Sequence, residues 1–402
     1  MNILIINMYY YPNVVGGTEN SIKLLAEGLV REGHKVVIYT LDGDNTTSSN
    51  TVDNINNVLV YRGYSKSAYG RWMHNKRTFF SVLVNRFHFF CNKNAILDIE
   101  KIVFNERIDV IHTNNLGSIS LSVWKWAWKN KIPLIHTVRD YWLIDPSTAI
   151  EGSNLFLSNF HRLLCKQFAN KYVENVTAPS RKTLELFLRH KFFSDANLEC
   201  IVNCIEFDES ILSQMIFEKS ARADDNIHFL FVGNLLENKG IRILLDSFKK
   251  VHDKDISLVI CGSGPEENMV KQEVKIDKKI NYKGRCNVEQ LKAEYIAADV
   301  LIVPSKWDEP FGRIIIEGAQ YGLPVIGSNR GGIPEIISTL ECGRLFDPNS
   351  VQDLTNQIEY FTSRAIIRQY MNNIPKNISY YSVEKQIGDF IHLYKEARDK
   401  FG

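Results

Sequence analysis

Short apolar runs alternate with helical patterns along most of the chain. The runs at 2–7, 35–40 and 58–62 are rich in β-branched residues, which is typical of strands buried on both faces. Segments with helical periodicity, such as 20–32, fill most of the intervals between runs. Further short strands are predicted at 110–112, 134–137 and 175–178. This alternation predicts an α/β protein with doubly wound parallel sheets.

The pattern is interrupted after Ile205. Residues 206–226 are polar and irregular, and a new series begins at Ile227, with predicted strands at 228–233, 257–261, 281–283, 300–304 and 324–327. Two Rossmann-like domains, 1–205 and 206–381, are therefore predicted to face each other across a cleft. The tail, 382–402, has the pattern of an amphipathic helix, and the polar stretch 42–57 is predicted to be a loop.

Composition and charge narrow the class of protein. The chain has 402 residues, of which 45% are hydrophobic, enough for two cores. Its net charge of +2 is uneven: up to Ile205 there are 23 Lys and Arg against 17 Asp and Glu, and afterwards 25 against 29. A near-zero charge without a recognisable binding module argues against nucleic acid as a partner.

Seven cysteines without zinc-site spacing indicate free thiols in a reducing cytosol. No apolar run reaches the ~18 residues of a membrane span. A cytoplasmic protein is therefore predicted.

The segment from Glu309 to Ile336 carries the strongest chemical signal. A buried strand leads through a loop to Gly312 and then to a helical pattern, so that backbone N–H groups are available to an anion at the helix start. Glu309 and Glu317 bracket this start with seven residues between them, and carboxylates accept hydrogen bonds from hydroxyl groups. An anion site flanked by hydroxyl acceptors predicts a nucleotide sugar as ligand.

The stretch EPFGRIIIEGA, followed by GLPVIGSNRGGIPE, resembles the signature of retaining GT-B glycosyltransferases of family 4. The resemblance extends over nearly the whole chain. It implies a GT-B fold and transfer of a sugar, with retention, from a nucleoside-diphosphate sugar. It further implies that Glu309 and the backbone of Phe311 and Gly312 bind the donor sugar, and that Glu317 binds the ribose.

Other matches to the family concern the donor phosphates. Gly16 and Gly17, in the sequence GGTE, resemble the family's GGxE; the loop is too long for a dinucleotide fingerprint, and a simple glycine-rich helix entry is the alternative. Lys239 matches a phosphate-binding lysine of the family, and a solvated surface lysine is the alternative interpretation. Asn234 stands where the family has arginine, and Arg313 is expected to compensate for that missing charge.

Two strand-end loops resemble those around the nucleobase in the family. They contain Gly262, in CGSGP, and Arg285, in YKGR. Ordinary turn glycines are the alternative interpretation.

In the first domain the resemblance implies an acceptor-side site with Asp140 and His112, which together with Glu309 are the catalytic candidates. Asn114 and Arg139 replace two histidines of the family pattern. A front-face transfer needs no strong protein nucleophile, so activity is still expected. For His112 a hydrogen-bonded, purely structural histidine is the alternative.

No metal or other cofactor is expected. Asp42 and Asp44 match the DxD of metal-dependent transferases, but they lie in a polar turn, for which Asp-Gly is common. Lys239, Arg313 and helix N-termini are expected to balance the diphosphate charge instead.

The segment 61–93 contains seven Lys and Arg, nine aromatic residues and no Asp or Glu. A basic amphipathic segment predicts peripheral contact with the anionic inner face of the cytoplasmic membrane, which suits a lipid-linked or other glycan acceptor. Aromatic core with a solvated basic face is the alternative.

The many Asn, Lys and Ile residues hint at an AT-rich bacterial gene and at surface polysaccharide synthesis. Two other functions remain open: a catalytically inactive, donor-binding partner subunit, suggested by Asn234, Asn114 and Arg139, and a non-hydrolysing nucleotide-sugar epimerase.

Overall fold

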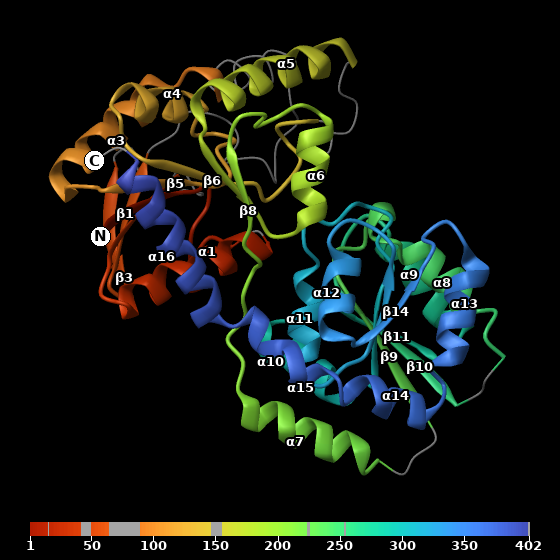
Figure 1. Cartoon of the computed structure of the whole chain (residues 1–402). Coiled ribbons are helices and arrows are strands. Elements are labelled where there is room, and N and C mark those ends of the chain that lie inside the picture. Colours follow the sequence, from red (N-terminus) through yellow and green to blue (C-terminus); the bar gives the residue numbers. More distant parts are fainter. Residues whose placement is uncertain are drawn as a thin grey trace. The chain divides into compact units, whose positions relative to one another are not determined.

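A computed structural model describes residues 1–14, 16–41, 50–63, 89–145, 155–222, 226–252 and 255–400. The chain divides into two compact units (Figure 1). The first unit contains Met1–Cys204 together with Val383–Gly402, and the second contains Ile205–Ser382.

The first unit is built on a sheet of eight strands in the order β3-β4-β2-β1-β5-β6-β7-β8. The strands are β1 (Asn2–Ile6), β2 (Lys35–Leu41), β3 (Thr51–Ile55), β4 (Val58–Gly63), β5 (Val110–Thr113), β6 (Leu134–Thr137), β7 (Asn175–Ala178) and β8 (Asn197–Cys200). All neighbours pair in parallel except β3, which runs antiparallel to β4. The prediction of a loop over 42–57 is therefore wrong at Thr51–Ile55, which forms this edge strand.

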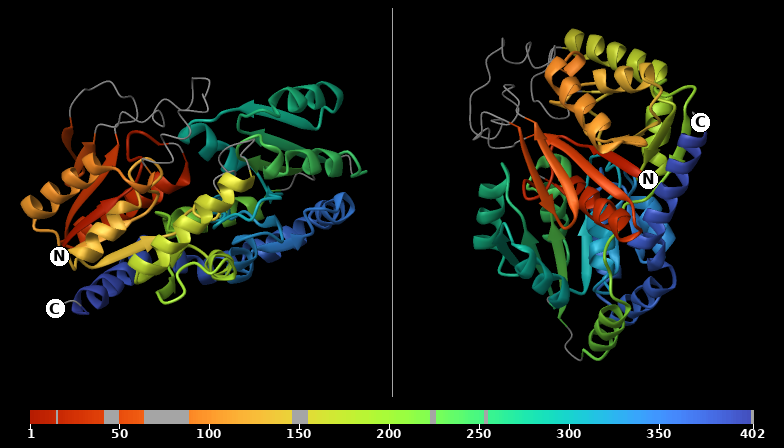
Figure 2. Two further views of the ribbon diagram at one scale, coloured as in Figure 1. Left: turned by 90° about the horizontal axis from the view of Figure 1, so that it is seen from above. Right: turned by 90° about the vertical axis from the view of Figure 1, so that its left-hand side faces the viewer.

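Helices cover both faces of this sheet. They are α1 (Gly17–Arg31), α3 (Lys93–Glu106), α4 (Ser122–Lys129), α5 (Leu155–Tyr172), α6 (Arg181–Arg189) and α16 (Val383–Asp399). The last helix, α16, lies beside α1 and against β5 and β6 (Figure 2, right). Close approach depends on Gly28 of α1, where a Cβ atom would overlap the side chain of Ile387.

The second unit has a six-stranded, wholly parallel sheet in the order β11-β10-β9-β12-β13-β14. Its strands are β9 (Ile227–Val232), β10 (Ile256–Cys261), β11 (Ile280–Gly284), β12 (Val300–Val303), β13 (Val325–Ser328) and β14 (Gly343–Phe346). Its α-helices are α7 (Glu209–Ser220), α8 (Ile241–Phe248), α9 (Glu267–Ile276), α10 (Val288–Ala297), α11 (Arg313–Ala319), α12 (Ile333–Leu340), α13 (Val351–Tyr360), α14 (Arg364–Met371) and α15 (Ile374–Asn377). The expectation of an irregular stretch over 206–226 is wrong, because α7 occupies much of it.

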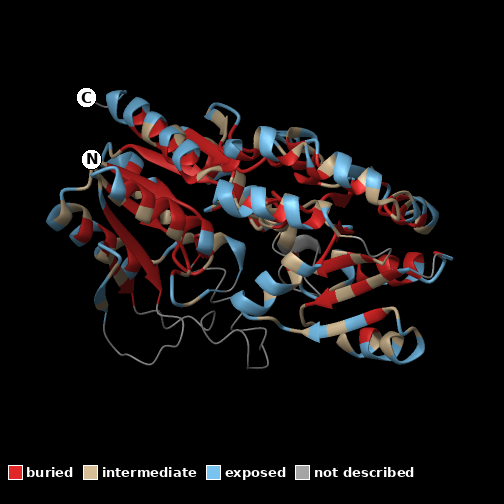
Figure 3. Ribbon diagram, turned by 90° about the horizontal axis from the view of Figure 1, so that it is seen from below, coloured by how far each residue is buried: buried red, intermediate tan, exposed pale blue. Residues whose placement is uncertain are grey.

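Each unit has its own apolar core, made by the strands and the inner helix faces (Figure 3). In the first unit the core includes Ile3, Ile38 and Val60 from the strands and Phe390 from α16. The burial of strand residues on both faces explains why the apolar runs are nearly continuous in the sequence.

A buried cluster of charges fastens α7 to the rest of the second unit. Asp299, 1% exposed, accepts hydrogen bonds from Arg222 at 2.8 Å, from Arg364 at 2.7 Å and from the backbone N–H of His228 at 2.9 Å. Lys219 of α7 donates to the carbonyl oxygens of Tyr295 and Ala298 at the end of α10. Burial, and after it the nearby charge of Arg222, lower the pKa of Lys219 to about 7.

Among the described residues, no helix has both the length and the hydropathy that crossing a membrane requires.

Candidate active site

Parallel α/β sheets bind ligands where the strand order reverses, at the carboxyl ends of the strands. In the second unit this reversal lies between β9 and β12, and Lys239 and Glu309 follow those two strands. In the first unit it lies between β1 and β5, and the loops with Gly16 and Asn115 follow those strands. Of the sequence-predicted residues, Gly16, Lys239 and Glu309 therefore lie at the switch points of the two sheets.

Glu309 is held in a fixed orientation in the second unit. Its Oε1 atom accepts hydrogen bonds from Lys239 Nζ at 2.5 Å and from Ser305 Oγ at 2.9 Å. The turn Gly331–Gly332 supports it from behind, since the Gly332 N–H donates to the Glu309 carbonyl at 2.7 Å. Both side-chain donors meet the same oxygen, and among the described residues Oε2 accepts no hydrogen bond, so it can accept one from a ligand.

Ser305, 2% exposed, was missed in the sequence. Its only signal in the sequence is its place two residues after the buried strand β12, in the loop at the ligand-binding edge of the sheet.

Glu317 lies one helical turn beyond Arg313 on α11. Arg313 Nε donates to Glu317 Oε1 at 2.7 Å, and the Tyr295 hydroxyl approaches Glu317 Oε2 at 3.4 Å. The charge of Arg313 is thus partly neutralised by the Glu317 carboxylate, so only part of it is available to a diphosphate. Tyr295, 3% exposed, is a second residue that the sequence did not reveal, because it comes from α10.

Glycines shape the backbone at this end of the second sheet. Gly240 ends the short turn Glu237–Lys239 at φ +77°, and a Cβ atom there would overlap the carbonyl oxygen of Pro304. Gly262 lies at φ +146° against the carbonyl of Gly233. Both positions therefore require glycine. The close approach of Gly240 to Pro304 brings Lys239 near the loop that follows β12.

The loops predicted to surround the nucleobase join one another. The Gly262 N–H donates to the Gly284 carbonyl at 2.7 Å, and the Tyr282 hydroxyl donates to the Gly262 carbonyl at 2.9 Å. Arg285 follows directly and is exposed, as is Asn234 at the end of β9. Phe311 is 4% exposed, with its ring 6.0 Å from that of Tyr381, so only its backbone is available to a ligand. Gly312, at φ +105°, begins α11.

In the first unit Gly16 precedes α1. Its N–H donates to Glu19 Oε2 at 2.8 Å, which satisfies a donor at the start of the helix. The φ of −158° is open to any residue, and a Cβ atom at Gly16 would meet no atom within 4 Å. Among the described residues, therefore, neither backbone conformation nor packing requires glycine at position 16.

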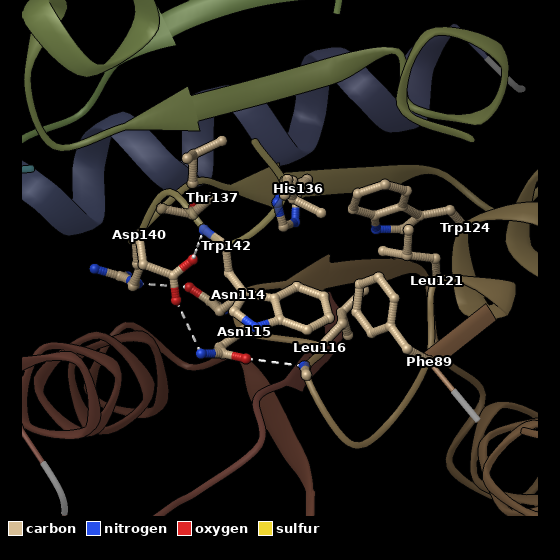
Figure 4. Close-up of a pocket in the computed structure, with 14 residues that line it drawn as sticks. Phe89, Asn114, Asn115, Leu116, Leu121, Trp124, His136, Thr137, Asp140 and Trp142 are labelled. Atoms are coloured by element: carbon tan, nitrogen blue, oxygen red, sulfur yellow. Dashed lines mark hydrogen bonds between the residues drawn. The ribbon is translucent and has the colours of Figure 1, made fainter. Parts of the chain in front are cut away.

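Asp140 is oriented by two donors (Figure 4). Asn115 Nδ2 donates to Oδ2 and the Trp142 N–H donates to Oδ1, each at 3.0 Å. Burial raises the pKa of Asp140, and the Trp142 N–H lowers it in part. The carboxyl lines a small cavity of about 20 Å³ with Phe89, Trp142 and His136, which is room for about one water molecule.

The two departures from the family pattern meet in space. Arg139 Nε donates to Asn114 Oδ1 at 2.7 Å, and Arg139 also reaches Asn203 Oδ1 at 2.7 Å. Asn114 is 2% exposed and lines the same cavity as Asp140. The two replacements therefore form one hydrogen-bonded pair and act as a single local change.

His112 lies in the core and does not reach this cavity. It is 0% exposed, with Nδ1 2.7 Å from the Tyr394 hydroxyl and Nε2 2.6 Å from Thr137 Oγ1. Burial lowers its pKa well below the usual value, so the ring stays neutral. The structure thus favours a structural histidine at this position over the proposed contact with substrate.

Two predictions lie outside the described residues. They are the Asp42–Asp44 pattern and all of the basic segment except 61–63 and 89–93. Within the described ranges, no three His, Cys, Asp or Glu side chains gather as a metal site would require.

Comparison with known proteins gives two family matches. Residues 15–209 match "Glycosyltransferase Family 4", and residues 213–377 match "Glycosyl transferases group 1". An uncharacterized 42.6 kDa protein in the cps region of Klebsiella pneumoniae is 27% identical over 361 residues, covering 88% of this chain and 91% of that protein.

Among solved structures, sucrose-phosphate synthase from Thermosynechococcus elongatus matches with a TM-score of 0.74 at 20% identity, covering 98% of both chains. Anabaena HepE in complex with UDP matches with a TM-score of 0.71 at 18% identity, covering 98% of this chain and 100% of that one. These likenesses establish a shared fold.

Proposed function

This chain belongs to the glycosyltransferases of family 4 and group 1, and from that premise we propose that it moves a sugar, with retention, from a nucleoside-diphosphate sugar to a glycan or lipid-linked acceptor. The proposed setting is bacterial surface polysaccharide synthesis. A relative encoded in a cps region and a fold neighbour bound to UDP support this proposal.

One observation carries the donor half of the proposal. Lys239 and Ser305 both bind Oε1 of Glu309, at 2.5 Å and 2.9 Å, and leave Oε2 to accept hydrogen bonds from sugar hydroxyls. The Lys239 ammonium donates more than one hydrogen bond, so it can serve a phosphate oxygen as well. The Glu309 carboxylate can accept hydrogen bonds from hydroxyl groups, and the Lys239 ammonium can bind a phosphate. Because an ion pair holds the two side by side, together they fit a sugar diphosphate.

The remaining donor contacts follow from their neighbours. Glu317, steadied by Arg313 and Tyr295, accepts hydrogen bonds from the ribose hydroxyls. The loops at Gly262 and Arg285 bind the nucleobase, and the backbone at Gly16 and Gly17, which carries no side chain, approaches the diphosphate.

The proposed reaction proceeds on one face of the sugar. The bond between the anomeric carbon and the diphosphate oxygen breaks, and the acceptor oxygen bonds to the same face. The acceptor proton passes to the departing phosphate. Asp140, held by Asn115 and Trp142, orients the sugar and the acceptor. Preorganised donors lower the barrier because they cost no reorganisation during the reaction.

We propose that no metal is needed, with the diphosphate charge met by Lys239 and by the partly shared charge of Arg313. Addition of a chelator then leaves the transfer rate unchanged. A loss of activity that Mg²⁺ or Mn²⁺ restores would overturn this part of the proposal.

Calorimetric titration with UDP, GDP, ADP and dTDP, followed by release assays with the matching sugar conjugates, tests the function. Binding of one nucleotide and slow release of its sugar to water or acceptor support a transferase. Binding without any turnover favours the inactive partner subunit. This alternative was suggested by Asn234, which stands where the family has an arginine. Conversion of the donor sugar without an acceptor would identify an epimerase.

A further inference from the structure

Two neighbouring helices of the first unit carry only positive charge. Neither α4 nor α5 contains Asp or Glu, whereas each of the other helices described in this unit, α1, α3, α6 and α16, has at least one. The cations are Lys125 and Lys129 on α4, Lys131 in the turn after it, and Arg162, Lys166 and Lys171 on α5.

These charges are not neutralised locally. In the described part of the chain, none of the six forms an ion pair with a carboxylate; Arg162, for example, donates to the amide oxygen of Asn159 at 2.8 Å. The crowding of charge extends to the turn after α6, where burial and then Arg162 and Lys166 lower the pKa of His190. A surface of one sign attracts a polyanion.

Large apolar side chains stand exposed among these charges. Trp128 of α4 is 45% exposed, and Phe160 and Leu163 of α5 are 54% and 47% exposed. The Trp128 ring contacts the ring of Tyr172 with centroids 5.6 Å apart, which joins the two helices into one face. Aromatic residues beside Lys and Arg are typical of surfaces that lie at the boundary of a lipid bilayer.

A second basic stretch of sequence packs against the inner side of α5. Residues 61–93 contain no acidic residue, and the described end of this stretch packs on α5. The Phe90 ring lies 5.8 Å from that of His161 and 6.0 Å from that of Phe168. Because His161 is 2% exposed, this contact lies on the buried side of α5 and does not cover the outer face of the helix.

We propose that the outer face of α4 and α5 docks on an anionic lipid bilayer. The cations meet lipid phosphates, while Trp128, Phe160 and Leu163 enter the headgroup region. Exposed apolar side chains favour a bilayer over nucleic acid, because duplex DNA offers no apolar phase to them. The surface deepens the proposed function by placing a lipid-linked acceptor beside the enzyme, but its binding to lipid does not depend on transfer.

Sedimentation of the full-length protein with phosphatidylcholine vesicles, with and without phosphatidylglycerol, tests this surface without any donor. The charge variant combines Lys125→Gln, Lys129→Gln and Lys131→Gln. At about fivefold per cation near an anionic membrane, partitioning onto phosphatidylglycerol vesicles should fall about a hundredfold. The apolar variant Phe160→Ser/Leu163→Ser keeps every charge and should also weaken binding.

A matched control changes the net charge equally on the second unit, by Lys250→Gln, Lys275→Gln and Lys278→Gln, all exposed lysines. The control should bind like the unchanged protein. Equal binding of the charge variant and the control would overturn the proposal. So would an apolar variant that binds normally while duplex DNA competes fully with the vesicles, since that marks a general polyanion site. Circular dichroism and thermal unfolding of each variant show whether the first unit is folded, so failure here is distinct from failure of the transferase proposal.

Discussion

The ion pair between Lys239 and Glu309 gives the sharpest test of the donor site. The two side chains are 29% and 16% exposed and their charged atoms are 2.5 Å apart. Because the pair is partly exposed, breaking it should cost the fold only about 1 kcal/mol. The two residues are nevertheless expected to act on different parts of the donor, which allows their roles to be separated.

Nucleoside diphosphate alone contains the phosphates but no donor sugar. A hydrogen bond to a charged group contributes about 1.5–3 kcal/mol, so Lys239→Met should weaken nucleoside diphosphate binding roughly tenfold to a hundredfold. Glu309→Gln should leave that affinity within about twofold, since the bond it loses is to the sugar. The same substitution should lower kcat/KM with the sugar donor roughly tenfold to a hundredfold.

Calorimetry with the diphosphate and single-turnover kinetics with the sugar conjugate measure the two quantities. Glu317→Gln is the matched control, because Glu317 is a carboxylate of the same site that is assigned to the ribose. Its substitution should therefore weaken the binding of nucleoside diphosphate. If Glu309→Gln weakens the binding of nucleoside diphosphate as much as Lys239→Met does, Glu309 serves only to position the lysine. The assignment of Glu309 to the sugar would then be refuted.

Three further outcomes are expected. Ser305→Ala removes one of the two donors to Glu309 and should raise KM for the sugar donor about fivefold, at about 1 kcal/mol per hydrogen bond, with unchanged diphosphate affinity; an equal loss in both would contradict a positioning role. Lys219 has a pKa of about 7 in the folded protein, below its value in the unfolded chain, so the unfolded chain binds more protons between these two values. The free energy of unfolding measured with urea should therefore rise from about pH 7 to pH 10, by at most about 1.4 kcal/mol per pH unit. Lys219→Met should abolish that rise, and an unaltered slope would exclude this lysine as its cause. Gly240→Ala should lower the unfolding free energy by about 2 kcal/mol or more and weaken diphosphate binding, whereas wild-type values in both would show that the turn tolerates a side chain.

The predicted GT-B fold is confirmed by the family matches and the fold neighbours. The parallel sheets could be predicted because strands buried on both faces leave nearly continuous apolar runs, and the resemblance of the segment from Glu309 to Ile336 implied the GT-B arrangement. The elements that were missed have no such runs: β3 is exposed through most of its length, and β8, NLEC, is polar and only partly buried. For α7 only three residues, Leu212, Met215 and Lys219, are buried, so its helical pattern is weak.

The site divides in the same way. Glu309, Glu317 and Lys239 stand in motifs with recognisable local spacing, and the structure brings Lys239 and Glu309 together. Contacts between distant segments leave no such trace. Arg139 meets Asn114 across 25 residues, and His112 meets Tyr394 across 282, so their roles depend on packing that one sequence does not display.

The placement of α16 has a consequence for synthesis on the ribosome. Domains usually fold in the order in which they emerge, but the core of the first unit includes Phe390 and Tyr394 from the far end of the chain. The second unit is one continuous segment, Ile205–Ser382, and can close as soon as it has emerged. The first unit, which is made earlier, must wait for α16, and the side chains of α1 and β5 that α16 covers stay exposed throughout elongation. Truncation before Val383 would make that delay permanent, so shortened forms should be chaperone clients even though their second unit is intact.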